Sequence, residues 1–365
     1  MAKLPDFNAV KNENIFKIIL KDKFSKCAFI VLLFLYLSVF LASFITPYSK
    51  EYSNREKSYC PPSKIYIINQ EGKLSYPYTY NYVRYFDKEN FETKYIEDKT
   101  QKYKVKYLAK GEKYKLFGII PFDRHFYNVE NGGELYLLGT DINGRDNFSR
   151  LLYGGQISLT IGFLALLISF PLGMLYGGIS GYLGGKTDFI MMRIAEAIMS
   201  IPSFYLLIIL ASILPANMTS VQRFSLIVVI LAFIGWAGFS RVVRGMVLSI
   251  KKREFILASE AMGASSIRTI VHHILPQTIS YVIVAMTLSV PGYILSESGL
   301  SFLGLGIQQP DASWGNMLKE AQEFVNIVSR PWLLAPGFLI FVAVLSFNVI
   351  GDTIRDALDP NSKER

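Results

Sequence analysis

"LLYGGQISLTIGFLALLISFPLGMLYGGISGYLGG", residues 151–185, contains no lysine, arginine, aspartate, glutamate or histidine. A helix that crosses a bilayer needs about 20 predominantly apolar residues, so this stretch is long enough to do so. In hydrocarbon each backbone N–H and C=O must be satisfied within the protein, and a helix meets that condition. Glycines gather at both ends of the stretch, which predicts that the span itself covers residues 157–179.

Five further charge-free stretches pass the same length test: 27–49, 197–222, 224–240, 274–296 and 331–351. The chain is 51% hydrophobic and only 18% charged, a low charged fraction for a soluble protein of 365 residues. The alternative, buried helices of a large soluble enzyme, would leave too little polar surface. We therefore predict an all-α polytopic membrane protein with six transmembrane helices, at 27–49, 157–179, 190–213, 224–243, 277–297 and 332–351.

The distribution of lysine and arginine predicts the orientation, because these residues are concentrated in cytoplasmic loops. If the N-terminus is inside, the inner segments 1–26, 186–196, 241–273 and 352–365 carry 17 basic residues, and the short outer loops 213–223 and 297–330 carry three. We expect a multi-pass protein of the cell (inner) membrane with both terminal tails, 1–26 and 352–365, in the cytoplasm. The first span is expected to be an uncleaved anchor. A signal peptide cleaved near residues 41–43 is the alternative.

Residues 50–135 are rich in tyrosine and lysine and alternate with period two at 64–68, 76–86 and 102–108. This pattern is typical of half-buried strands and predicts a small β-rich extracytoplasmic insertion after the first helix. We expect it to dock through residues 117–126 on the outer helix ends or on a partner protein; a solvated spacer is the alternative. A thiol reagent added from outside is expected to reach Cys60.

The sequence does not support three other kinds of functional site: a nucleotide-binding loop, a metal site and a nucleic-acid-binding surface. "SGYLGGKT" (180–187) has Ser180 where a phosphate-binding P-loop requires its first glycine. His272 and His273 are adjacent, so on a helix they point about 100° apart and cannot bind one metal together. Basic and acidic residues nearly balance in the insertion, which argues against nucleic acid as a partner. The sequence predicts no catalytic residue, cofactor or metal site in this chain.

The polar stretch "EFILASEAMGASSIRTIVHHILP", residues 254–276, separates two apolar spans. It favours a helix, which Gly263 can end in a left-handed conformation. Ser265 or Ser266 can cap a second helix over 267–274, and Pro276 marks entry into the next span. The small side chains of this hairpin are expected to be exposed and to permit close approach by a partner: Ala258, Ser259, Ala261, Gly263 and Ala264.

This stretch resembles the "EAA" loop of ABC-importer permeases, with Leu257-Ala258-Ser259 at the triplet, then Gly263 and Leu275-Pro276. Leu257 departs from the usual glutamate, and His273 stands in place of an apolar residue. Four other stretches resemble the C-type permease of the dipeptide and oligopeptide branch, so that the resemblance covers about 138–360: "LGTDINGRDNFSRLLYGGQISLTIG" (138–162), "GGKTDFIMMRIAEAIMSIPSF" (184–204), "ESGLSFLGLGIQQPDASWGNML" (297–318) and "NVIGDTIRDALDP" (348–360).

The resemblance implies a type I ABC importer permease fold, with a permease core at 136–351 and a cytoplasmic coupling loop at 244–276. It implies a peptide importer in the lipid bilayer with a second, B-type permease, two subunits that bind ATP and magnesium, and an extracytoplasmic peptide-binding protein. The residues expected to couple to the ATPase are Arg253, Glu254, Leu257, Ala258, Ser259, Gly263, Ala264, Leu275 and Pro276.

An outer mouth of the pathway is expected at Glu297, Ser298 and Trp314, with a tryptophan anchor at the lipid headgroups as the alternative for Trp314. Similar permeases carry nickel or other small solutes, and that reading stays open. Two other classes compete: an ion-coupled secondary transporter, which would predict internal repeats, and a membrane-anchored binding module built on the insertion.

Overall fold

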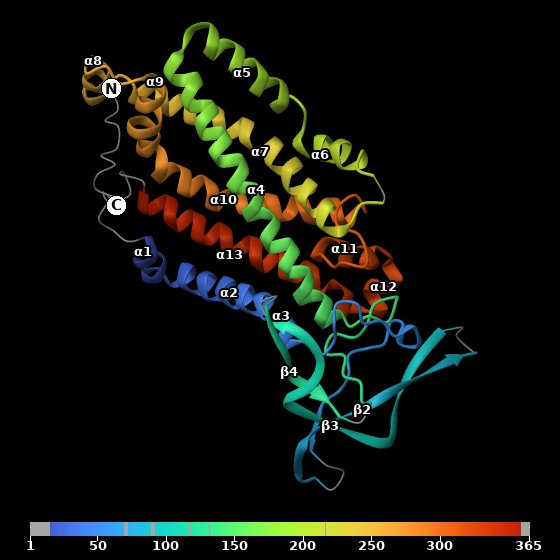
Figure 1. Cartoon of the computed structure of the whole chain (residues 1–365). Coiled ribbons are helices and arrows are strands. Elements are labelled where there is room, and N and C mark those ends of the chain that lie inside the picture. The colour runs from blue at the N-terminus through green and yellow to red at the C-terminus, as the bar shows by residue number, and fades with distance from the viewer. Residues whose placement is uncertain are drawn as a thin grey trace. The chain divides into compact units, whose positions relative to one another are not determined.

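The computed structural model describes residues 15–68, 72–88, 92–116, 119–130, 132–215 and 217–358 (Figure 1). Residues 1–14 and 359–365, which belong to the two predicted tails, lie outside this range. The chain forms two compact units: a helical unit of Met1–Leu33, Leu159–Leu300 and Phe341–Arg365, and a mixed unit of Phe34–Ser158 and Ser301–Ile340.

The longer helices are mostly apolar. The α-helices are α1 (Ile15–Lys21), α2 (Lys23–Phe40), α3 (Ala42–Ile45), α4 (Asn147–Leu183), α5 (Gly185–Met199), α6 (Ser203–Ser212), α7 (Ser220–Ile250), α8 (Glu254–Ala261), α9 (Ser266–Arg268), α10 (Ile279–Phe302), α11 (Trp314–Leu318), α12 (Phe324–Ser329) and α13 (Ala335–Leu358). Short 3-10 helices cover Arg55–Lys57, Leu275–Thr278, Lys319–Gln322 and Pro331–Leu334, and a π-helical turn covers Thr269–Ile274.

Among the described residues, five helical stretches are long and apolar enough to cross a membrane, or six if a bent helix pair counts as one span. The five are Lys23–Phe40, Asn147–Leu183, Ser220–Ile250, Ser266–Phe302 and Pro331–Leu358. The bent pair consists of α5 and α6, which meet at 79°. The structure is therefore helical with five to six apolar spans.

The bend between α5 and α6 replaces the unbroken helix that we predicted at 190–213. Pro202 lies in the break and has no backbone N–H to donate, and a proline also disfavours helical geometry in the residue before it. The long apolar run concealed this local signal. If α5 and α6 count as one span, that span is composed of two short helices with a sharp change of direction.

Helix α4 begins ten residues before the predicted span and ends four residues after it. Most of the glycines predicted to mark the ends of the span, Gly154, Gly155, Gly177, Gly178 and Gly181, lie within this helix, whereas Gly184 and Gly185 follow its end. A Cβ added at Gly177 would lie 2.3 Å from the Ser240 carbonyl oxygen, and one at Gly181 would lie 2.9 Å from the Arg244 carbonyl oxygen. Together with Gly173 they recur every four residues on one face, where they allow α7 to approach closely.

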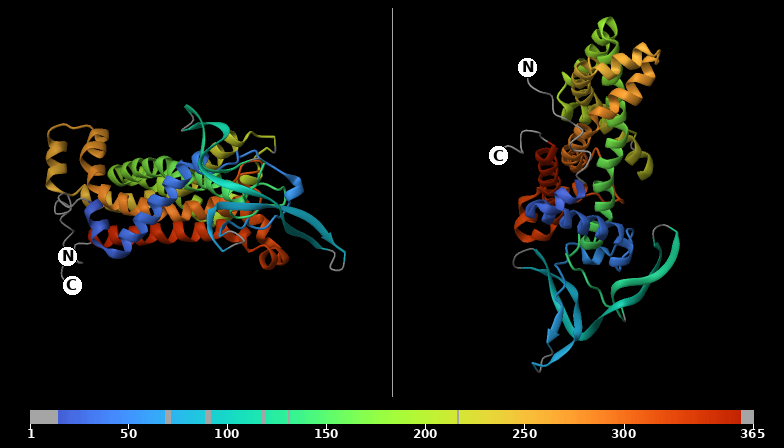
Figure 2. Two further views of the ribbon diagram at one scale, coloured as in Figure 1. Left: turned by 90° about the horizontal axis from the view of Figure 1, so that it is seen from below. Right: turned by 90° about the vertical axis from the view of Figure 1, so that its left-hand side faces the viewer.

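The insertion contains a four-stranded antiparallel sheet in the order β1-β2-β3-β4, which confirms that it is β-rich. The strands are β1 (Tyr66–Ile68), β2 (Leu74–Asp87), β3 (Glu92–Leu116) and β4 (Ile120–Val129). The first part of β3 pairs with β2 and its last part pairs with β4, so the sheet divides into two arms that point away from each other (Figure 2). Strand β4 was not predicted and occupies most of the segment 117–126, of which residues 117 and 118 lie outside the described range.

The sheet packs against neighbouring parts of the mixed unit through tyrosine-rich clusters. One cluster joins Cys60, Tyr82 and Tyr136, and Tyr52 and Tyr136 share a 2.8 Å hydrogen bond between their hydroxyl groups. A second joins Val105, Tyr127 and Leu135. Cys60 is completely buried, and this burial raises the pKa of its thiol to about 12. The expectation that an external reagent reaches Cys60 is therefore wrong.

Candidate functional site

The polar stretch 254–276 forms a helical hairpin in the helical unit. After α8, Gly263 adopts φ +84°. Its N–H donates to the Glu260 carbonyl at 2.9 Å, and the Ala264 N–H donates to the Ser259 carbonyl at 3.1 Å. This pair of bonds is a Schellman motif, which ends a helix with a left-handed residue. The Ser265 hydroxyl then accepts the N–H of Arg268 at 3.5 Å and caps α9, so both the predicted turn and the predicted cap are confirmed.

Two side-chain contacts tie the hairpin to the end of α4. The Tyr182 hydroxyl donates to the Glu260 carboxylate at 2.7 Å. Just before α8, the Lys251 ammonium donates to the Gly181 carbonyl at 2.8 Å. Figure 1 shows α8 and α9 beside the turn that joins α4 and α5. A displacement of the hairpin would therefore act first on α4.

That turn is itself fixed to α7. Gly184 and Gly185 both have positive φ, which reverses the chain in two residues. Asp188, one turn into α5, accepts two hydrogen bonds from the Arg244 guanidinium, each 2.5 Å long, and one from the Ser180 hydroxyl. Bidentate pairing of this kind holds geometry as well as contributing energy. The ends of α4, α5 and α7 consequently form one polar junction under the hairpin.

The hairpin presents only some of the predicted coupling residues at its surface. Glu254, Leu257, Ala258, Gly263 and Pro276 are exposed, while Arg253 and Ala264 are half-buried. The structure contradicts the expected exposure of Ser259 and also buries Leu275, since their side chains point into the helical unit. These two side chains pack within the helical unit and help to hold the hairpin in place.

Large apolar side chains dominate the exposed surface of the hairpin. The sequence analysis predicted small side chains there. Met262 is 83% exposed, and Phe255, Leu257, Ile267 and Val271 are also exposed. Exposed apolar groups on a short polar loop mark a contact surface more often than isolated exposed residues do. The sequence feature that indicates this contact surface is the presence of Phe255, Met262 and Ile267 in an otherwise polar stretch.

The residues predicted at an outer mouth are all buried. Glu297 and Ser298 lie within α10 and are buried in the helical unit. Trp314 is 0% exposed in the mixed unit; its indole N–H donates to the Leu151 carbonyl at 2.9 Å and its backbone N–H to the Ser158 hydroxyl at 3.1 Å. Trp314 therefore supports the start of α4. Its side chain is buried at a position where we predicted an exposed one.

A cavity of about 530 Å³ opens within the helical unit. Its lining is apolar apart from hydroxyl groups and carries no charged side chain. It is lined by Phe170, Ser203, Leu207, Leu231, Ile234, Gly235, Gly238, Phe239, Val242, Tyr281, Ala285, Leu288, Ser289, Gly292, Tyr293 and Ser296. The size suits a small organic solute.

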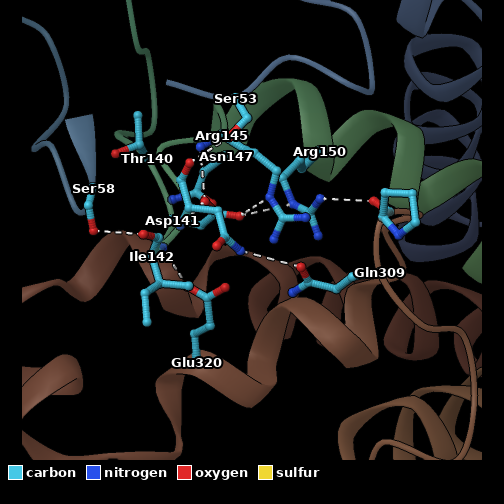
Figure 3. A network of polar contacts seen from close by, with 12 residues as sticks. Ser53, Ser58, Thr140, Asp141, Ile142, Arg145, Asn147, Arg150, Gln309 and Glu320 are labelled. Carbon is cyan, nitrogen blue, oxygen red and sulfur yellow. Dashed lines mark hydrogen bonds and ion pairs between the residues drawn. The ribbon is translucent and has the colours of Figure 1, made fainter. Parts of the chain in front are cut away.

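A buried polar cluster in the mixed unit holds the segment before α4 (Figure 3). One Asp141 carboxylate oxygen accepts the N–H groups of Asn143 and Arg145, at 2.8 and 2.9 Å. The other accepts from the Arg145 Nε at 2.6 Å and lies 3.5 Å from the Arg150 Nε. Glu320 accepts the Ile142 N–H at 3.1 Å. Because these charges are desolvated, each depends on its partners, which makes the cluster a rigid anchor.

Asp146 is the N-cap residue of α4. Its raised pKa predicts that the stability of the folded chain depends on pH. Its carboxylate accepts the N–H and the hydroxyl of Ser149 at 2.8 and 2.6 Å, yet burial raises its pKa from 3.8 to about 7. The folded pKa lies above the ordinary value, so this contribution to stability is fully present below about pH 4 and is lost as the pH rises through 7. Thermal unfolding of the purified chain between pH 4 and 8 should show this loss. Asp146→Asn, which keeps the cap without titrating, should reduce the slope; an unchanged slope would contradict the assignment.

Residues 155–364 match the family described as the inner membrane component of binding-protein-dependent transport systems. This match covers more than half of the chain and includes the hairpin and the cavity. The protein belongs to this family and is a multi-pass membrane protein.

Three relatives are named peptide permeases. The chain is 46% identical to the dipeptide transport system permease protein DppC of Bacillus subtilis, over 61% of this chain and 68% of that protein. It is 42% identical to the oligopeptide transport system permease protein OppC of Haemophilus influenzae, over 62% and 71%. It is 40% identical to the oligopeptide permease OppC of Bacillus subtilis, over 67% and 80%.

Proposed function

We propose that this chain is the permease subunit of an ATP-driven importer that translocates di- or oligopeptides. The observation that carries the proposal is the 40–46% identity to relatives named dipeptide and oligopeptide permeases. The uncharged lining of the 530 Å³ cavity supports it, because a wall without fixed charge does not select for or against the charge of a peptide side chain. Half of the translocation path is assigned to this cavity, and a second, B-type permease supplies the other half.

The hairpin is proposed to couple this chain to one of two ATP-hydrolysing subunits. Its exposed apolar side chains, Phe255, Met262 and Ile267, offer a surface that a groove on such a subunit can cover. Closure of the ATPase pair would push on the hairpin, and the contact from Glu260 to Tyr182 would pass that displacement to α4. The helices then exchange between two arrangements, which nucleotide binding biases. An extracytoplasmic binding protein delivers the peptide.

Peptide uptake by the complete complex in proteoliposomes tests the function. We expect ATP-dependent accumulation of a labelled peptide. Gly292→Phe should abolish it with little loss of stability, because Gly292 lines the 530 Å³ cavity into which the ring can extend, and a Cβ added there lies within 4 Å of no described atom. Gly292→Ser is the matched control and should transport normally. Uptake of nickel or another small solute in place of peptides would contradict the proposal.

The proposed orientation places both termini in the cytoplasm and the insertion outside. It rests on the excess of basic residues in the short segments assigned to the inner face. In a Cys27→Ala background, a membrane-impermeant thiol reagent applied to intact cells should label Leu74→Cys, which is exposed in β2, and should not label Ser265→Cys. Native Cys60 should stay unreactive in both proteins. Labelling at position 265 would reverse the topology.

A further inference from the structure

One arm of the sheet exposes a cluster of apolar side chains that has no role in the proposed transport mechanism. The cluster lies on the arm formed by residues 107–116 of β3, residue 119 of the turn and residues 120–126 of β4. Ile119 is 80% exposed, and Tyr107, Leu108, Ile120 and Phe126 are each about half exposed. Five large apolar groups are thus exposed on one short arm, and exposed apolar groups that gather on a surface usually mark a protein or membrane contact.

The arm packs beside the end of an apolar helix within the mixed unit. Phe44 of α3 lies 6.5 Å from Phe122 and 6.3 Å from Phe126, measured between ring centroids. Tyr107 extends the same aromatic group at 6.0 Å from Phe126. Helix α3 follows α2, one of the helices that is long and apolar enough to cross the membrane. Figures 1 and 2 both show this arm beside α3, while the other arm points away from it. The apolar patch is thus continuous with a membrane-spanning segment.

Lysines frame the apolar patch. Lys106, Lys110, Lys113 and Lys115 are exposed on the same stretch of β3. Lys106 pairs with Glu130, and Lys110 lies 3.7 Å from Asp123, so part of this positive charge is balanced within the sheet. Aromatic rings with flanking lysines are characteristic of the membrane–water interface, where lysines meet lipid phosphates and rings occupy the headgroup level.

The backbone at Leu108 supports an external partner. Leu108 has φ 51°, a left-handed conformation that costs a non-glycine residue about 1–2 kcal/mol. The register of β3 and β4 pairs Tyr107 with Tyr127 and Ala109 with His125, which sets Leu108 opposite Phe126. Leu108 is 53% exposed and Phe126 is 48% exposed, so this unfavourable conformation is kept at a place where two apolar side chains face solvent.

From these observations we propose that this arm docks on the lipid surface next to α3. Tyr107, Leu108, Ile119, Ile120 and Phe126 enter the boundary between headgroups and acyl chains. The lysines contact lipid phosphates. This contact fixes the insertion relative to the bilayer at a second point besides the helix that leads into it.

Site-directed spin labelling of the full chain in lipid nanodiscs tests the proposal. Cys27→Ala removes the exposed native cysteine, and Cys60 stays buried. Nitroxides at Ile119→Cys and Ile120→Cys should collide more often with oxygen than with a water-soluble nickel chelate. The control, Leu74→Cys on the other arm, is 86% exposed and should show the reverse.

Lipid composition separates a membrane contact from a protein contact. Adding phosphatidylglycerol to phosphatidylcholine nanodiscs should increase the oxygen preference at position 119. Lys113→Gln and Lys115→Gln should each lower the ratio of docked to undocked arm by up to about fivefold in the anionic discs. Accessibility to the nickel chelate at position 119 equal to that at 74 would overturn the proposal. So would protection from both reagents in the complete complex, which would indicate a protein partner.

Discussion

Replacing Gly177 with alanine is expected to destabilise the helical unit by about 1–3 kcal/mol. The added Cβ would lie 2.3 Å from the Ser240 carbonyl oxygen, 2.9 Å from the Val243 Cβ and 3.0 Å from the Arg244 nitrogen. Two of these atoms belong to the backbone of α7, which cannot turn aside as a flexible side chain can. The two helices would have to separate, and the junction of Asp188 with Arg244 would be strained at the same time.

Gly245→Ala is the matched control on the opposite helix. A Cβ there meets no atom within 4 Å, so the substitution should show only the gain in helix propensity, up to about 1 kcal/mol. The two alanines should therefore change the free energy of unfolding in opposite directions. Denaturant titration of the purified chain in detergent, followed by circular dichroism, measures both. Equal effects would mean that α4 and α7 do not pack through this glycine face.

The same glycines explain which part of the helical fold could be predicted. Charge-free length identified the apolar spans, because a hydrocarbon environment constrains composition over about 20 residues. Charge-free length did not distinguish a glycine that ends a helix from a glycine that allows a neighbouring helix to pack closely, since both appear as small residues near the end of an apolar run. The three-dimensional neighbour, α7, decides between these roles, and its register relative to α4 is not visible in the composition.

The strands show the opposite limitation. Alternation located β1, β2 and part of β3, because those segments place tyrosines on one face at period two. Strand β4 has the sequence "IPFDRHFYNV". Its second residue is a proline and it contains the adjacent charged residues Asp123 and Arg124, so its alternation of apolar and polar residues is weak. Hydrogen bonding to the last part of β3 stabilises this segment as a strand, which its local sequence pattern does not indicate.

The candidate site was predicted in outline and missed in detail. The turn at Gly263 and the cap at Ser265 follow from local backbone rules, and both were predicted. The burial of Ser259, Glu297 and Trp314 depends on which side of a helix faces the rest of the unit. A single sequence fixes that rotation poorly where helices have no strong polar face, so polar residues at the ends of spans were placed on surfaces.

Gly263→Val is expected to reduce peptide uptake by about 5–30-fold, the population change that corresponds to 1–2 kcal/mol of strain in the turn. At φ +84° a β-branched side chain disfavours the Schellman motif, although a Cβ added at this position lies within 4 Å of no described atom. The cost is therefore conformational and local, and global stability should hardly change.

Gly263→Asn is the control for this change, because asparagine tolerates left-handed backbone geometry far better than valine. It should retain most of the uptake while adding a side chain of similar size to the exposed turn. ATP hydrolysis measured alongside uptake in proteoliposomes distinguishes lost coupling from lost assembly: continued hydrolysis without transport is expected for valine. If both variants lost transport equally, crowding at the partner surface would be responsible and not the turn; if valine transported normally, the hairpin would have no part in coupling. The contrast between the two side chains thus tests whether the left-handed residue, by setting the angle between α8 and α9, aims Met262 and Ile267 at the ATPase.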